Sequence, residues 1–288
     1  MSDQGAAGKA PSELTLRILS AVILIAVVLT ATWLGGPYFF ALCVIASALV
    51  LYEFLHIVRR DVVASRAWLA PVALAVILAI WYGAGAYPAM AAFGIGFLVL
   101  LGFEAFMQRS AWLAGGLAYA TLPLVALVML RGSEAIGLHA VFFIFACVWG
   151  ADTLAYFAGR TIGGPKLAPT ISPKKTWSGF FGGLAGSVLA ASVILYPAGY
   201  ALSLPAVALM VALSIVSQMG DLLESWIKRR FDKKDSGRII PGHGGIMDRI
   251  DGLITASIAA WLVGGLVAGD WLTQGNAAKG LFAAFILP

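Results

Sequence analysis

Charged residues are scarce in this sequence. Of its 288 residues only 11% are charged, while 61% are hydrophobic. A soluble domain usually carries about 25% charged residues. A soluble core of this size could not bury so much apolar surface. The composition therefore excludes an ordinary soluble protein and favours a chain that lies in lipid.

Cysteine and histidine are scarce too. The two cysteines, Cys43 and Cys147, both lie inside apolar runs, which excludes a disulfide framework. There are three histidines and no evident Ser–His–acid triad. We see no repeat at a fixed period and nothing that predicts a nucleic-acid partner.

Long apolar runs are what the sequence has instead. A membrane span needs about 20 mostly apolar residues, and backbone amides in lipid must be paired internally, so such runs should be helices. The nine runs are Ile18–Gly35, Tyr38–Val58, Ala67–Gly85, Tyr87–Met107, Ala111–Leu130, Leu138–Ala158, Gly179–Tyr196, Leu202–Leu223 and Ile250–Ala268. We therefore predict an all-α integral membrane protein, with a polar tail at 1–13 and a membrane domain at 14–288.

The basic residues predict the orientation. Lys and Arg concentrate on the cytoplasmic side of membrane proteins. If the N-terminus is cytoplasmic, only Arg131 and Lys279 of the 19 bases fall outside. We therefore expect nine helices in a multi-pass protein of the cell membrane (the inner membrane of a Gram-negative source), with the C-terminus on the outer side. Glu53, His56 and Glu104 near inner span ends suggest snorkelling or local pairing rather than function.

One segment is densely charged. Residues 221–251 hold six of the chain's 14 acids and seven of its 19 bases. If the eighth span continues inward as a helix, one face carries Asp221, Glu224, Ser225, Lys228, Asp232 and Asp235. At the start of the ninth span, Asp248, Asp251 and Thr255 repeat this spacing. Two acidic helix faces are thus expected to meet at the inner membrane boundary.

This pattern suits a metal ion and phosphate groups. Mg²⁺ takes one or two carboxylates and completes its shell with water and substrate phosphate. We expect Asp221 and Asp248, with Asp251 beside them, to bind Mg²⁺ or another divalent cation, with room for a second cation. Basic side chains bind phosphate oxygens. The candidates for that role are Lys228, Arg229, Lys234 and Arg249, with Asp235 and Ser225 near them.

A glycine-rich turn, 241–245, joins the two acidic faces. Its amides, including those of Gly244 and Gly245, could form an anion-binding nest, although a tight helix connection would look the same. His243 could donate to phosphate, act as a general acid or hold the loop.

A second polar strip covers residues 149–179. Asp152 lies within an apolar span, where an acid marks either a functional site or a buried ion pair between helices. The loop that follows contains Ser172, Lys174 and Lys175 and leads through capping residues into the next span. We expect it to face the charged segment, giving a cytoplasmic catalytic region of 149–179 plus 217–255.

The motif from Ser225 through Lys234, Asp235, His243 and Asp248 to Asp251 resembles the diagnostic motif of phosphatidate cytidylyltransferases (CDP-diacylglycerol synthases). The strip 172–176 resembles a second family feature; Ser178 departs from the family's usual Glu or Gln. The resemblance implies the reaction of CTP with phosphatidate to give CDP-diacylglycerol and pyrophosphate. It also implies divalent-metal dependence through Asp221 and Asp248, and a homodimer.

Three other functions are compatible with parts of the pattern. A CTP-dependent polyprenol kinase would share the nucleotide site but release CDP. A transporter would use Asp152, Asp221 and Asp248 as a conduction path, and it predicts acids at mid-depth in several spans. A lipid-binding scaffold would explain the bases but not the acids in helical register.

Overall fold

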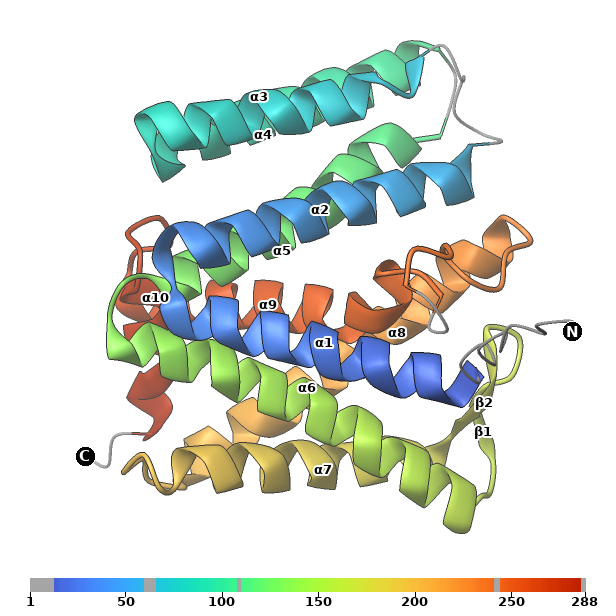
Figure 1. Ribbon diagram of the computed structural model, residues 1–288, viewed down its shortest axis with the longest axis vertical. Coiled ribbons are helices and arrows are strands. Elements are labelled where there is room, and N and C mark those ends of the chain that lie inside the picture. Colours follow the sequence, from blue (N-terminus) through green and yellow to red (C-terminus); the bar gives the residue numbers. More distant parts are fainter. Residues whose placement is uncertain (1–12, 60–65, 108–109, 241–243, 286–288) are drawn as a thin grey trace, which may run out of the picture.

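The computed structural model describes residues 13–59, 66–107, 110–240 and 244–285. It is a bundle of long helices that run back and forth between two ends (Figure 1). The helices in chain order are α1 (Glu13–Leu34), α2 (Gly36–Val58), α3 (Leu69–Ala84), α4 (Ala86–Phe106), α5 (Trp112–Arg131), α6 (Ala135–Thr161), α7 (Trp177–Leu195), α8 (Leu204–Arg230), α9 (Met247–Ala268) and α10 (Asn276–Phe282).

Eight of these helices are long and apolar enough to cross a membrane, so the chain is a multi-pass membrane protein. Each predicted span corresponds to one helix of α1–α9. The third, α3, has only 16 residues and falls short of the length that a perpendicular span needs. The sequence predicted nine full spans, and eight of the described helices have the length and apolarity of a span. Residues 1–12 of the predicted tail lie outside the described residues, and residue 13 already belongs to α1.

Burial places α5 at the centre. In its most apolar stretch 72% of residues are buried, against 11% in α1, which lies at the rim. The helices α2, α3, α4, α6 and α9 pack against α5, and α3 and α4 also pack against each other at one edge of the bundle (Figure 1). Because a membrane helix can face lipid, the apolar outer faces of α1 and α3 need no protein cover.

Small residues bring α6 and α7 very close together. A Cβ on Gly150 would lie 2.5 Å from the Gly186 carbonyl oxygen, so only glycine fits this crossing. Small residues at helix interfaces allow such close backbone approach in membranes. The pair thus holds the segment between the two helices firmly at one end of the bundle.

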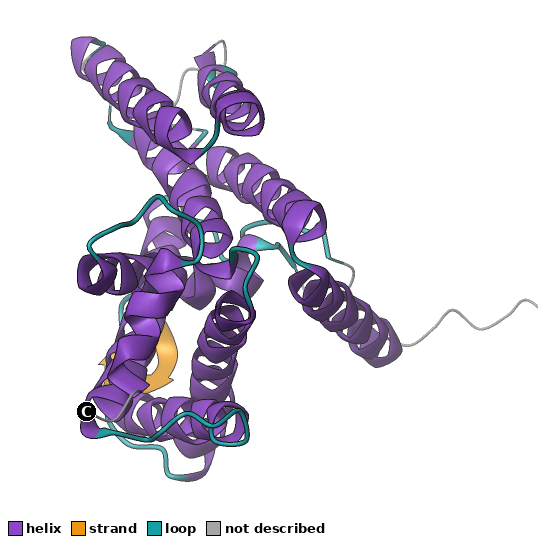
Figure 2. Cartoon of the chain, turned by 90° about the vertical axis from the view of Figure 1, so that its left-hand side faces the viewer, coloured by secondary structure: helices purple, strands orange, loops and turns teal. Residues whose placement is uncertain are grey.

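That segment is a β-hairpin, although the sequence predicted a loop. The strands β1 (Lys166–Ala168) and β2 (Ser172–Thr176) pair antiparallel, with Lys166 opposite Thr176. Figure 2 looks along the bundle and shows the strands at its far end. The expected cap of α7 is confirmed, since the Thr176 hydroxyl accepts the Gly179 N–H at 3.1 Å. The hairpin directs Lys175 towards α8.

Candidate functional site

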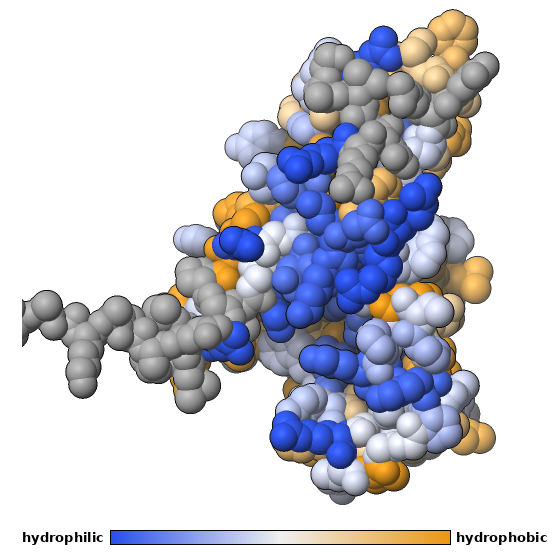
Figure 3. Space-filling model, turned by 90° about the vertical axis from the view of Figure 1, so that its right-hand side faces the viewer, coloured by the Kyte–Doolittle hydropathy of each residue, from blue (hydrophilic) through white to orange (hydrophobic). Residues whose placement is uncertain are grey.

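The end of the bundle that carries the hairpin also carries the turn between α8 and α9 (Figure 1). Figure 3 views the molecule from this side, and hydrophilic residues gather at its centre between apolar flanks. The predicted meeting of the second polar strip with the charged segment is confirmed by one contact. The Lys175 ammonium lies 2.5 Å from Asp221 Oδ2.

Helix α8 supplies Asp221, Ser225 and Lys228 on one face, as the spacing predicted. The helix ends at Arg230, however, and Asp232 has a φ of +56°. The expectation that Asp232 and Asp235 continue this face is therefore wrong. The reversal is stabilised locally, because Arg229 donates from Nη1 to the Lys233 carbonyl at 2.8 Å. Arg229 thus holds the turn in this structure.

Helix α9 begins at Met247 and supplies Asp248 and Asp251, in agreement with the prediction. Lys228 joins the two helices: its ammonium lies 2.5 Å from Glu224 Oε2 and 2.6 Å from Asp248 Oδ1. Glu224 is 1% exposed and Lys228 8%, so this is a buried acid–base–acid triad. Glu224 Oε1 is buried and has no partner among the described residues.

A second cluster of acids surrounds Lys175. Asp152 on α6, Asp221 on α8 and Asp251 on α9 interact electrostatically with one another, and both Asp152 and Asp251 interact with Lys175. Ser225 donates a long hydrogen bond, 3.4 Å, to Asp221 Oδ1. By residue exposure Asp152 is exposed, and Asp221 and Asp251 are half-buried.

The amides of the glycine turn have unexpected partners. Asp248 accepts the Gly245 N–H at 3.1 Å and the Ser236 N–H at 3.0 Å. Gly244, at φ +89°, exchanges two backbone hydrogen bonds with Ile240. In this structure the chain's own oxygens occupy the amides of Gly244 and Gly245, and the binding of phosphate by this turn stays a prediction. His243 lies outside the described residues.

Glu53 of α2 completes the turn, and the sequence did not identify it as a site residue. Its carboxylate accepts the Ser236 hydroxyl at 2.9 Å, the Ile246 N–H at 3.1 Å and the Met247 N–H at 2.9 Å. Glu53 therefore caps α9, whose own N-cap position is Ile246 and offers no side-chain oxygen. An apolar N-cap beside an acid at an inner span end is the signal that could have suggested this pairing.

The remaining predicted residues lie around the rim. Lys174 is exposed on β2, with Ser172 half-buried on the same strand, and Arg249 is exposed on α9. Lys234 and Asp235 belong to the loop after α8 and line a separate pocket beside α2. Predicted residues with mutual contacts or electrostatic interactions include Asp152, Lys175, Asp221, Ser225, Lys228, Gly245, Asp248 and Asp251.

The structure also bears on metal binding. Within the described residues, no group of three or more His, Cys, Asp or Glu side chains is arranged to hold a metal ion. Asp221 and Asp248 instead each hold a lysine ammonium within 2.6 Å. Hard carboxylate oxygens that each attract a cation fit the donor chemistry of Mg²⁺, which needs only one or two protein carboxylates. The ammonium groups of Lys175 and Lys228 therefore occupy positions to which a divalent cation would also be attracted.

Comparison with known proteins agrees with the motif. Residues 15–267 match the model of the cytidylyltransferase family. A phosphatidate cytidylyltransferase of Brucella abortus is 42% identical over 89% of this chain and 95% of its own length. One of Haemophilus influenzae is 34% identical over 83% of this chain and 94% of its own length. In Staphylococcus haemolyticus another is 50% identical over 40% of this chain and 45% of its own length. The chain therefore belongs to the phosphatidate cytidylyltransferase family and is a nucleotidyltransferase.

Proposed function

We propose that the chain transfers the cytidylyl group of CTP to phosphatidate, giving CDP-diacylglycerol and pyrophosphate for phospholipid synthesis. The names of its relatives and the family motif support this reaction. The observation that carries the proposal is the pair of contacts Lys175–Asp221 and Lys228–Asp248 at one polar end of the bundle. Each contact pairs an acid, which could hold a metal, with a base, which could bind phosphate, and this supports the proposal.

The nucleophile in this reaction is the phosphate of phosphatidate. A phosphate monoester has a second pKa near 6, so it is mostly dianionic at neutral pH and needs no protein base. One of its oxygens attacks the α-phosphorus of CTP in line, the new P–O–P bond forms, and pyrophosphate leaves with its electron pair. The remaining difficulty is repulsion between anions, and cations relieve it.

We propose that Asp221 and Asp248, with Asp251 beside them, hold the divalent cation. When bound, Mg²⁺ would neutralise phosphate charge and help to orient the reacting groups. Asp248 would be held for this role by the N–H groups of Gly245 and Ser236 and by the Lys228 ammonium. Asp221 is held in position by Ser225.

Lys175 and Lys228 are also proposed to bind phosphate. A cation held by Asp221 and Asp248 would supply the positive charge that Lys175 and Lys228 now provide there, and the two ammonium groups would then be able to meet phosphate oxygens. Arg229, Lys234, Arg249 and Lys174 would extend the basic surface at the rim. Gly244 and Gly245 then act through the shape of the turn, and Asp152 adds negative charge on the far side of Lys175.

The site is proposed to face the cytoplasm of a bacterial cell membrane. Nearly all Lys and Arg residues lie in the loops that are expected on the cytoplasmic side. The hairpin and the α8–α9 turn lie at the same end of the bundle (Figure 1). A site at this boundary lets a soluble nucleotide meet a phosphate anchored in the bilayer. The homodimer implied by the family resemblance stays a prediction, which light scattering of the purified protein in detergent would test.

One assay tests the proposed function. The purified chain is incubated with phosphatidate and CTP labelled on the α-phosphate, with and without Mg²⁺. We expect label in a lipid product together with released pyrophosphate, both dependent on Mg²⁺. Release of CDP with a phosphorylated lipid would instead identify a kinase. Uptake of a solute into liposomes that contain the protein, in the absence of CTP, would instead favour the transporter hypothesis.

A further inference from the structure

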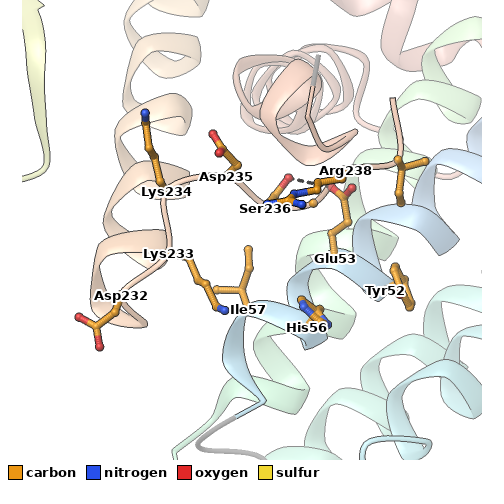
Figure 4. A pocket seen from close by; sticks show the side chains of 12 residues that line it. Tyr52, Glu53, His56, Ile57, Asp232, Lys233, Lys234, Asp235, Ser236 and Arg238 are labelled. Atoms are coloured by element: carbon orange, nitrogen blue, oxygen red, sulfur yellow. Dashed lines mark hydrogen bonds between the residues drawn. The ribbon is translucent and has the colours of Figure 1, made fainter. Parts of the chain in front are cut away.

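A pocket of about 620 Å³ lies between α2 and the loop 232–239, and Asp221 and Asp248 are not among its lining residues. Figure 4 shows that Lys233 reaches into it towards Ile57 and His56, while Asp232 and Lys234 point away. Arg238 lies across it, in front of Glu53 (Figure 4). Among the described residues, neither the Lys233 ammonium nor the Arg238 guanidinium forms an ion pair or a side-chain hydrogen bond. The proposed reaction assigns neither residue a role.

Of the three acids that line this pocket only Glu53 faces it, so the two bases outnumber the acids there. Glu53 faces the pocket, but its two oxygens already accept three hydrogen bonds, from Ser236, Ile246 and Met247. Asp232 and Asp235 are directed away from the interior (Figure 4). The groups left to meet a ligand are therefore Lys233, Arg238 and His56, which is stacked on Tyr52.

The pocket adjoins an apolar groove. Tyr52 and His56 also line a second cavity of about 630 Å³ between α2 and α3. Its other lining residues are almost all apolar, among them Leu55, Leu74 and Ala75, and Arg59 stands at the polar end of α2. In a membrane this groove is covered by lipid chains. The basic pocket beside it would then select the headgroup of that lipid, since Lys and Arg near the surface attract anionic lipids.

We propose that this pocket and groove together bind one anionic glycerophospholipid of the bilayer. Its phosphate lies against Lys233 and Arg238, with His56 as a further donor, and one acyl chain lies in the α2–α3 groove. This site is separate from the acids that are proposed to hold the metal. The proposal does not depend on the cytidylyl-transfer reaction.

Native mass spectrometry of the full chain in detergent tests the headgroup. The delipidated protein is titrated with phosphatidylglycerol or with phosphatidylcholine of the same acyl chains, without CTP. We expect the first phosphatidylglycerol to bind at least about tenfold more tightly than phosphatidylcholine, because two basic side chains each add about 1 kcal/mol. In Lys233→Ala/Arg238→Ala the preference should fall below about twofold.

Matched controls separate this site from general charge. The variant Arg160→Ala/Lys166→Ala removes two bases from the same end of the bundle and should keep the preference. Ala75→Trp fills the groove and should weaken the binding of both lipids, whereas Val76→Trp, at an exposed position of α3 that does not line the groove, should not. No preference in the wild type, a preference that survives in the Lys233/Arg238 variant, or equal loss in the control pair would overturn the proposal.

Discussion

The carboxylate of Glu53 on α2 accepts the backbone N–H of Met247, 194 positions later, at 2.9 Å. Together with its bonds to Ser236 and Ile246, this contact fixes the turn in which Asp248 is held. A buried acid of an early helix therefore positions an acid that is proposed to bind metal. Glu53 touches no reacting group in this scheme and acts only through the turn.

We expect Glu53→Gln to lower kcat about tenfold or more and to leave KM for CTP within about threefold. The amide keeps one acceptor but directs an NH₂ group at donors of the turn, which leaves a buried amide unpaired. Steady-state kinetics of cytidylyl transfer measure the change.

The matched control is Glu104→Gln. Glu104 is also buried and caps a helix, α5, by accepting the N–H groups of Leu113 and Ala114. Both variants should lose stability by about 1–3 kcal/mol. Only the Glu53 variant should lose turnover beyond its loss of folded protein; equal losses of turnover would contradict the positioning role.

The second prediction concerns the triad of Glu224, Lys228 and Asp248. Lys228→Met leaves two buried carboxylates facing each other and should reduce stability by about 3–5 kcal/mol. Thermal unfolding in detergent measures the loss. The double variant Glu224→Gln/Lys228→Met should be less destabilised than the sum of the two single variants, since one uncompensated charge is removed. Additive losses would show that Lys228 and Glu224 are not coupled.

The third prediction tests the metal carboxylates. Asp221→Asn and Asp248→Asn should each lower turnover at least about a hundredfold and raise the Mg²⁺ concentration needed for half-maximal rate. Activity is measured across a Mg²⁺ titration with CTP and phosphatidate. Asp270→Asn, in the turn after α9, serves as the control and should titrate like the wild type. Near-normal turnover of Asp248→Asn at saturating Mg²⁺ would refute its metal role.

A fourth prediction concerns Gly245. A Cβ at this position would collide with the Ser236 hydroxyl and lie 2.6 Å from Glu53 Oε2. Gly245→Ala should therefore displace the turn and abolish most activity, while the remaining helices stay folded. Gly94→Ala on α4 is the control, because a Cβ there meets nothing within 4 Å. Circular dichroism and the transfer assay compare the two variants; full activity of Gly245→Ala would contradict this view of the turn.

The sequence predicted the helices well because lipid imposes a simple rule on length and polarity. It also predicted that Lys175 would approach the charged segment, and Lys175 contacts Asp221. It did not predict the end of α8 at Arg230, because the Arg229–Lys233 bond that stabilises the reversal depends on a local geometry that spacing does not show. It also missed that Ile240 and Asp248 occupy the amides of Gly244 and Gly245. Nor did it predict that Glu53 caps α9, since Glu53 is remote in the chain and the two come together only on folding.

The pairing of Glu53 with residues 236–247 also orders events during synthesis. The helix α2 is synthesised long before the segment that it caps. Until then the Glu53 carboxylate has none of these partners and is solvated by water at the membrane boundary. Only when Met247 has emerged can that acid be withdrawn from water and the α8–α9 turn set. A chain that stops before α9 would therefore leave Glu53 without the N–H groups of Ile246 and Met247.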